Sequence, residues 1–197
     1  MTYNSFINAY KGKSVDFDGV PKKDPVQCVD LVKYYLRDVF SITAGAWGNA
    51  RDYYECFNSK SWGGYRVMNS AFTRIENTPD FIPMKGDIAV WGSGLSQYGH
   101  IAICDGIGTT SYFYSYDQNW NGKAYKRVKH SYKGFLGVLR PKRKVTSAVN
   151  IRTGPGTTYL IKGEKKKNEK VTLYEIKGNF GRIGKNQWVH LNYLSDI

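Results

Sequence analysis

The sequence has few cysteines, and their number limits how the chain can be stabilised. Cys28, Cys56 and Cys104 are the three in 197 residues. Three cysteines cannot form a full disulfide framework, because at least one is left free or pairs outside the chain. A reducing site of synthesis is the simplest interpretation.

Long apolar runs are also missing. No window reaches the roughly 18 apolar residues of a membrane-spanning helix, so we expect no membrane insertion. Residues 1–17 contain no apolar stretch typical of a secretory signal, so we expect no signal peptide. A target outside the cell therefore requires another route of delivery.

Acidic residues are scarce relative to basic ones, and the formal net charge is +13. Residues 1–140 hold 17 basic and 12 acidic side chains, and residues 141–197 hold 12 and 4. This charge favours an anionic partner: nucleic acid, an anionic membrane surface or an acidic cell-wall polymer. Nucleic acid is disfavoured, because the sequence has no recognisable recognition helix, zinc spacing or RNA-binding motif.

The chain does contain enough apolar (41%) and aromatic (15%) residues to fold. A boundary lies in "GVLRPKRKVTS", where a strand-like run ends at Pro141 and a basic run follows. Beyond it, short β-rich runs alternate with Gly, Pro and Asn, which is typical of a small all-β barrel. We expect a first domain at 1–140, a linker at 141–145 and the barrel at 146–197.

The first 140 residues predict an α+β fold. Residues 26–40 have apolar positions at helical spacing, and residues 47–57 form a second helical segment. Five strands are expected in residues 85–92, 98–108, 110–120, 124–132 and 135–140. Helices followed by an antiparallel sheet indicate the α+β class.

One set of polar residues suggests thiol chemistry. Cys28 lies near the start of the first helix, and a thiol is activated by a helix N-terminus and a nearby imidazole. His100 begins a strong strand after a glycine that allows another segment to approach closely. Asp117 and Asn119, one strand later, share a face if that strand is regular, and either can orient the base. The order predicts a thiol-hydrolase site.

Each of these residues also has a structural interpretation. A cysteine at a helix start is more often a core residue than a nucleophile. Cys104 shares a strand face with His100 and lies either near the site or in the core, and Cys56 is expected in the core. His130, after a basic run, is expected to be exposed, and His190 is expected in the small barrel.

Five motifs, in the order "QCVDLV", "WGNA", "KGDIAVW", "GHIAI" and "DQNW", resemble the CHAP family of cysteine, histidine-dependent amidohydrolases/peptidases. These are papain-like peptidoglycan hydrolases common in phage endolysins. The resemblance implies that Cys28 is the nucleophile and His100 the base. It also implies that Asp117, where many members carry Glu, or Asn119 orients His100.

The resemblance further implies acyl transfer from an amide of cell-wall peptide. Backbone N–H groups at the helix start, with the Gln27 side chain, are expected to stabilise the oxyanion. Trp47, Trp91 and Trp120 are candidate walls of the substrate groove, with a place in the core as the alternative for each.

A metal site is also implied. Asp16 and Asp18 in "DFDGV" place hard oxygen ligands two residues apart before a glycine turn, which suits Ca²⁺. Some CHAP endolysins bind calcium with such a loop and the Asp two residues after the cysteine, which is Asp30 here. Lys22 and Lys23 in a longer loop weaken a cation site, and a solvated turn is the alternative. No organic cofactor is expected.

Local sequence supports two starting points for the cysteine's helix. Asp24 fits an N-cap, with Pro25 as the first helical residue and Gln27 as the third. That start places Cys28 one turn inside the helix and commits its N–H to a helical hydrogen bond. A start nearer Gln27 leaves the N–H available to an oxyanion.

Residues 145–197 resemble a bacterial SH3-like domain, through the N-x-R-x-G-P stretch, a later "WV" and a closing "YL". This resemblance implies binding to cell-wall peptide or polymer. The segment "KGEKKKNEK" is either a solvated turn or a source of salt-sensitive attraction to teichoic-acid phosphates.

The leading hypothesis is a monomeric phage or prophage endolysin, a cysteine amidase or endopeptidase. It is expected to be made in the host cytoplasm and to act on the peptidoglycan of a Gram-positive wall after release. The alternatives are a bacterial autolysin or wall-remodelling hydrolase, a catalytically inactive wall-binding protein, a nucleic-acid binder, and a thiol enzyme that transfers the acyl group to an amine.

Overall fold

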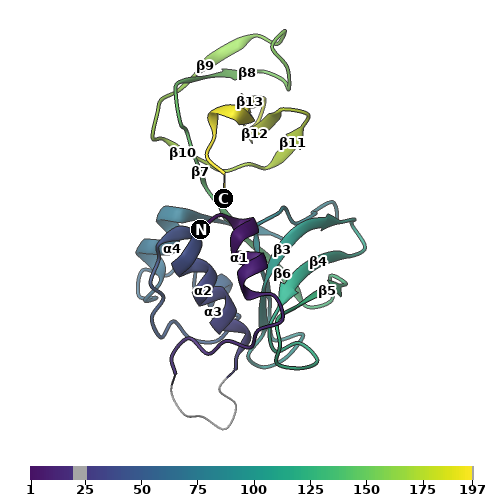
Figure 1. The fold of residues 1–197 in the computed structure, drawn as a ribbon. Helices are drawn as coiled ribbons and strands as arrows, with labels where there is room; N and C mark the ends of the chain where they lie inside the picture. Colours follow the sequence, from purple (N-terminus) through teal and green to yellow (C-terminus); the bar gives the residue numbers. More distant parts are fainter. Residues whose placement is uncertain (20–25, 197) are drawn as a thin grey trace. The chain divides into compact units, whose positions relative to one another are not determined.

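The computed structural model describes residues 1–19 and 26–196. The chain divides into two compact units, Met1–Arg140 and Pro141–Ile197 (Figure 1). Asp24 and Pro25, which define the earlier of the two helix starts, lie outside the described residues. Each unit is described by itself.

The first unit has the predicted α+β fold. Its helices are α1 (Tyr3–Tyr10), α2 (Cys28–Phe40), α3 (Asp52–Glu55) and α4 (Tyr65–Ala71). Its strands are β1 (Phe72–Glu76), β2 (Ile88–Trp91), β3 (His100–Gly108), β4 (Phe113–Asp117), β5 (Lys126–His130) and β6 (Phe135–Pro141). They form one sheet in the order β1-β6-β2-β3-β4-β5, antiparallel at every pairing from β6 to β5. Figure 1 shows the helices gathered on one side of this sheet.

Helix α2 joins the helical layer to the sheet. Its inward residues Leu31, Val32, Tyr35 and Leu36 are fully buried, and the helix packs on β3. Burying side chains of this size stabilises the fold by about 1.5–3 kcal/mol each. The start of α2 is thereby held beside the start of β3.

The centre of the sheet explains the apolar runs in the sequence. All four residues of β2 and the first five of β3 are buried, so these strands show no polar alternation. β4 alternates between buried and half-buried residues instead. A buried ion pair interrupts this core, in which the Arg140 guanidinium donates to the Asp87 carboxylate at 2.6 and 2.9 Å.

The glycine before β3 permits the close approach expected from the sequence. Gly99 has φ +71°, and a Cβ atom there would overlap the Trp91 carbonyl oxygen. A side chain at this position is therefore excluded both by backbone conformation and by contact. This contact brings the loop before His100 against the end of β2.

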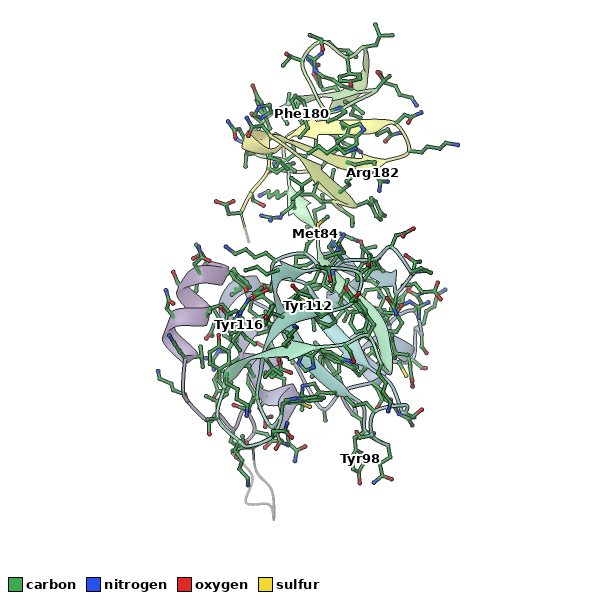
Figure 2. The ribbon with its side chains drawn as sticks, turned by 90° about the vertical axis from the view of Figure 1, so that its right-hand side faces the viewer. Met84, Tyr98, Tyr112, Tyr116, Phe180 and Arg182 are labelled. Carbon is green, nitrogen blue, oxygen red and sulfur yellow. The ribbon has the colours of Figure 1, made fainter. Side chains whose placement is uncertain are left out.

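The second unit is all-β among its described residues, apart from one 3₁₀ turn. Its strands are β7 (Arg143–Lys144), β8 (Val149–Arg152), β9 (Ile161–Lys165), β10 (Lys170–Val171), β11 (Glu175–Lys177), β12 (Phe180–Gly184) and β13 (Gln187–His190), followed by η1 (Leu191–Tyr193). They form a five-stranded sheet, β11-β12-β13-β8-β9, and a β10-β7 pair. Phe180 and Arg182 of β12 are labelled in Figure 2.

The prediction of a linker at residues 141–145 is partly wrong. Within residues 141–145, β7 pairs with β10, and Val145 is fully buried and bridges to Leu194. These pairings make Arg143 to Val145 part of the second unit. No helix in the described part of the chain is long and apolar enough to cross a membrane.

Candidate active site

Cys28 is the first residue of α2. Gln27, the N-cap, has extended backbone angles (φ −110°, ψ 155°). The Asp30 carboxylate accepts the Gln27 N–H at 2.8 Å, as in a capping box. The helix therefore begins just after Gln27, the later of the two starts considered. The Cys28 N–H is then among the first four N–H groups, which have no acceptor within a helix.

Gln118 holds the residue that precedes the cysteine. Its side-chain amide donates to the carbonyl oxygens of Gln27 (2.7 Å) and Val15 (2.8 Å). Its side-chain oxygen accepts the Val15 N–H at 2.8 Å. Gln118 is fully buried. The sequence reasoning assigned it no role, and its place in "DQNW" is the signal that pointed to it.

His100 and Asp117 form the centre of the site. His100 begins β3 and Asp117 ends the adjacent strand β4, and the distance from His100 Nε2 to Asp117 Oδ2 is 2.7 Å. Burial acts to raise the pKa of Asp117, but hydrogen bonds from His100 and His130 outweigh burial and hold that pKa below its ordinary value. The carboxylate is therefore ionised, and the His100 Nε2–H donates to it.

His100 faces the thiol with its other nitrogen. Burial alone would lower the pKa of His100, but hydrogen bonds with Asp117 and with the Cys28 thiol, together with the charges of both, raise that pKa to about 9. Since Nε2 is bonded to Asp117, Nδ1 is the atom left for Cys28. His100 therefore holds a proton next to the sulfur at neutral pH.

Asp117 has two further buried partners. His130 Nε2 lies 3.0 Å from the same Oδ2 atom, and Ser115 Oγ donates to Oδ1 at 2.6 Å. His130 is 4% exposed, so the expectation that it lies at the surface was wrong. Alternation along β5 turns Arg127 and Lys129 to solvent, while Val128 and His130 share the opposite face. That alternation was visible in "KRVKH".

Asn119 lies beyond the regular strand. β4 ends at Asp117, so the face shared by alternation does not extend to Asn119. Asn119 has φ +58°, a conformation that asparagine tolerates better than most residues. It lines the pocket described next, whereas Asp117 is the residue bonded to His100.

A pocket of about 350 Å³ lies over the cysteine and histidine. It is lined from the start of α2, the loop before β3 and the turn after β4, by Gln27, Cys28, Leu95, Ser96, Tyr98, Gly99, His100, Asn119, Trp120 and Asn121. Tyr98 is 59% exposed and projects outward from the first unit (Figure 2). A ligand in this pocket would contact both members of the thiol–imidazole pair.

The three tryptophans expected at the groove have different positions. Trp120 lines the pocket, with its ring centroid 4.9 Å from that of His100. Trp91 is 1% exposed and packs in the core against the His100 ring, because β2 is buried on both faces. Trp47 is 8% exposed and packs against Trp62. The assignments of Trp47 and Trp91 to the groove are therefore corrected to packing positions.

The three cysteines differ in their burial and surroundings. Cys104 is fully buried in the core, and burial raises its thiol pKa well above the ordinary value. Cys56 is half-buried, where a core position was expected. Cys28 is the cysteine that lines the pocket, and it is the one beside an imidazole.

The carboxylates expected to bind calcium have other partners. Asp16 accepts a backbone N–H of its own turn, and Asp30 caps α2 and lies 3.9 Å from Lys33. Burial raises the pKa of Asp30, and repulsion from Asp18 and Asp16 adds to that rise. Within residues 1–19 and 26–196, no group of three or more His, Cys, Asp or Glu is arranged to hold a metal ion. Calcium binding therefore stays a prediction.

Known proteins resemble this chain in sequence. It is 31% identical to endolysin LysK of Staphylococcus phage K over 197 residues, which is 99% of this chain and 35% of that protein. It is 33% identical to endolysin PlyTW of Staphylococcus phage Twort over 155 residues, which is 74% of this chain and 30% of that protein. The chain thus spans about a third of the length of these curated relatives.

A solved structure resembles it in fold. The crystal structure of the wild-type endolysin LysIME-EF1 has a TM-score of 0.54 and 31% identity, and the match covers 72% of this chain and 64% of that chain. Residues 18–119, more than half of the chain, match the CHAP domain family. That segment contains Cys28, His100 and Asp117. The order of the five motifs, the antiparallel α+β fold and this match agree, and the chain belongs to the CHAP domain family.

Proposed function

We propose that this chain is a peptidoglycan hydrolase that cleaves an amide bond of cell-wall peptide through a Cys28 thioester. One observation carries the proposal: Cys28 begins α2 beside His100, whose Nε2 donates to the buried Asp117, and a pocket opens onto the pair. Membership of the CHAP domain family supports this chemistry, and relatives described as phage endolysins support the wall as its target.

The first half-reaction is acylation of the cysteine. The Cys28 sulfur, as a thiolate paired with the His100 imidazolium, attacks the amide carbonyl. A C–S bond forms, and the carbonyl oxygen becomes an oxyanion. The Cys28 N–H at the start of α2 is a donor for this oxyanion, with the Gln27 side chain as a second donor. The His100 imidazolium then donates its Nδ1 proton to the leaving amine, and the C–N bond breaks.

The second half-reaction returns the enzyme. Neutral His100 takes a proton from water, and the hydroxide attacks the thioester carbonyl. The C–S bond breaks, and the sulfur leaves as a thiolate beside the reprotonated His100. The peptide leaves as a carboxylic acid, which gives its proton to solvent. Asp117 holds the imidazole in one tautomer throughout, which is the role of the third member of such a site.

The second unit is proposed to anchor the enzyme to the wall. Its support is the excess of basic residues in 141–197 and a pocket of about 460 Å³. That pocket is lined by Ala148, Val149, Asn150, Arg152, Thr157, Phe180, His190, Asn192 and Tyr193. Arg152 is held by donation to the Thr157 and Tyr159 carbonyl oxygens, at 2.8 and 2.9 Å. Wall peptide or teichoic-acid phosphate is the proposed ligand.

Calcium is proposed as a structural ion at Asp16, Asp18 and Asp30, which are not already assembled as a metal site among the described residues and would have to draw together around it. The support is electrostatic, since repulsion among these carboxylates contributes to the raised pKa of Asp30 and a divalent cation would relieve it. Ca²⁺ added to EDTA-treated protein should raise the melting temperature, and Asp18→Asn should abolish the rise. An equal rise in both proteins would contradict the site.

Turbidity of purified Gram-positive cell walls tests the hydrolase. Wild-type protein should clear the suspension, and Cys28→Ala should not. Wild-type protein that leaves walls intact, with and without Ca²⁺, would refute the hydrolase. Equal clearing by Cys28→Ala would refute the nucleophile.

Mass spectrometry of the fragments identifies the bond and the acceptor. A new N-terminal amine on a whole stem peptide indicates an amidase, and cleavage within the stem or cross-bridge indicates an endopeptidase. Products joined to an added amine would favour acyl transfer over hydrolysis. We expect hydrolysis, with the enzyme made in the host cytoplasm and acting on the wall after release.

A further inference from the structure

The carboxylate of Asp117 is shared by two imidazoles from different strands. His100 on β3 and His130 on β5 both place Nε2 within 3.0 Å of Oδ2, while Ser115 occupies Oδ1. Because the carboxylate is ionised, all three groups donate to it. The proposed reaction uses His100 and Asp117 but assigns nothing to His130.

The ring of His130 is enclosed by aromatic side chains. Its centroid lies 4.6 Å from both Trp91 and Trp120 and 5.9 Å from Phe113, and the residue is 4% exposed. A polar ring in such surroundings is costly unless its polar atoms are bonded. The bond to Asp117 offsets that cost and fixes the direction of the imidazole.

This arrangement restrains the carboxylate. Rotation of Asp117 about its side-chain bonds would break bonds to His130, Ser115 and His100 together. Without His130, Asp117 Oδ2 would still accept the His100 N–H, but the second hydrogen bond that limits movement of this oxygen would be lost. The oxygen that sets the direction of the His100 ring is therefore held from the opposite side by His130.

Titratable groups near this cluster or near Cys28 come from four elements besides β5. They are Cys28 on α2, Tyr53 on α3, His100 and Cys104 on β3, and Asp117 on β4. Cys104 and Tyr53 are buried. His130 is linked to the reacting pair through the Asp117 carboxylate, which it shares with His100.

We infer that His130 is a positioning residue that fixes the Asp117 carboxylate and thereby aims His100 at Cys28. The inference rests on the proposed function, because it concerns the same site. It predicts that removing the His130 donor loosens the Asp117–His100 bond, slows reaction at Cys28 and makes His100 lose its proton at lower pH.

Nuclear magnetic resonance of full-length Cys28→Ala protein, labelled with ¹⁵N-histidine, tests the coupling. Two low-field Nε2–H signals are expected, one from each buried imidazole. His130→Phe should remove one and shift the other, and His130→Gln, which keeps an N–H donor, should shift it less. Lys129→Gln, on the solvent face of the same strand, is the control. A folded His130→Phe protein with an unshifted His100 signal would overturn the inference.

Alkylation of Cys28 by iodoacetamide, followed by peptide mass spectrometry across pH, tests the consequence. His130→Phe should slow alkylation about 10- to 100-fold, as expected when a reacting group is misplaced. The alkaline inflection in the plot of alkylation rate against pH, which reports loss of the His100 proton, should move to lower pH in His130→Phe. His130→Gln should restore part of the rate and part of the inflection pH. An unchanged rate or an inflection moved to higher pH would overturn the inference.

Neither measurement requires cell walls. Wild-type protein that fails to clear walls would refute the proposed function and leave both readouts interpretable. If wild-type protein clears walls but His130→Phe changes neither the His100 signal nor the alkylation rate of Cys28, only the positioning role is refuted.

Discussion

Asp117 determines which atom of His100 faces the thiol. Its carboxylate accepts Nε2–H, so Nδ1 is turned toward Cys28 and the imidazole cannot exchange the two nitrogens without breaking a 2.7 Å bond. Ser115 and His130 hold the same carboxylate. The chemistry proposed at Cys28 therefore depends on a residue that is not among those lining the pocket.

Replacing this carboxylate should disable the site with little effect on substrate binding. Asp117→Asn removes the charge that keeps His100 protonated and correctly oriented. We expect the maximal rate of wall clearing to fall by about 10²–10⁴-fold, with the apparent affinity for walls unchanged. Asp105→Asn is the matched control, because the Asp105 side chain is also largely buried (7% exposed) and pairs with Arg127 on the same sheet. Equal losses in the two variants would contradict the assignment.

Protonation of His100 gives a pH dependence with a defined sign. Its pKa is raised from the ordinary 6.5 to about 9. Its contribution to stability is therefore fully present below about pH 6.5 and is lost as pH rises through about 9. The melting temperature of wild-type protein should fall more across this range than that of His100→Ala. Parallel curves would contradict a stabilising imidazolium, and wall clearing should decline over the same range.

At the scale of elements, the sequence predicts what is locally periodic. Residues 26–40 have helical spacing and the five later segments have strand-like sequences, and these correspond to α2 and to β2 through β6. Of the helical segment expected at 47–57, only Asp52–Glu55 forms an α-helix, α3. Helix α1 was missed because its eight residues are too short for a clear period. β1 was missed because it follows α4 with no turn residue between them.

The order of the motifs along the chain was enough to predict part of the site. Cys28, His100 and Asp117 stand in recognisable motifs, and the structure brings them together. The contacts of Gln118 and His130 link segments that are far apart in sequence, so no local pattern contains them. The burial of Trp91 depends on the strands on both sides of β2, which sequence spacing does not reveal.

The loop into β3 depends on a glycine. Gly99→Ala forces a left-handed backbone conformation on alanine and places its Cβ against the Trp91 carbonyl. We expect a loss of at least about 1–3 kcal/mol in the free energy of unfolding and slower wall clearing, because His100 follows directly. Gly12→Ala is the matched control, since Gly12 has φ +73° but a Cβ atom added there would meet no atom within 4 Å among the described residues. Urea denaturation should show the smaller loss for Gly12→Ala, and equal losses would exclude the contact with Trp91.

The start of α2 depends on the Gln118 side chain. Gln118→Met keeps the length of the side chain but leaves the Gln27 carbonyl and both backbone groups of Val15 without this partner. The Gln27 carbonyl still accepts the Asp30 N–H at 3.2 Å, so we expect a loss of about 1–3 kcal/mol in the free energy of unfolding, mainly from the part-buried groups of Val15. Hydrogen exchange should rise at Val15 and in the first turn of α2. Unchanged exchange and unchanged stability would show that Gln118 does not hold this segment.

At the scale of the whole molecule, charge is unevenly divided. The second unit holds 12 basic and 4 acidic residues, and its lysine-rich turn carries exposed Lys166 and Lys167. Exposed charges are screened beyond about 10 Å at 0.1 M salt. A wall anchor that uses such residues should therefore be sensitive to ionic strength.

Salt should separate electrostatic wall binding from binding in the pocket of the second unit. The double variant Lys166→Gln, Lys167→Gln should bind walls less than wild-type protein at low salt and equally near 1 M, where the screening length is about 3 Å. Sedimentation of protein with walls measures both. Lys11→Gln with Lys60→Gln, which removes two exposed charges from the first unit, is the control. Equal weakening by both pairs would indicate a response to net charge alone.

The indole of Trp120 gives the molecule an internal optical signal. It lies 4.9 Å from the ring of His100 and 4.6 Å from that of His130. A protonated imidazole quenches indole fluorescence on contact, whereas a neutral one does so weakly. Trp91 also lies near His100, at 5.4 Å between ring centroids. The emission of Trp91 and Trp120 should therefore brighten as His100 loses its proton, so that the charge state of the site can be followed in unlabelled protein.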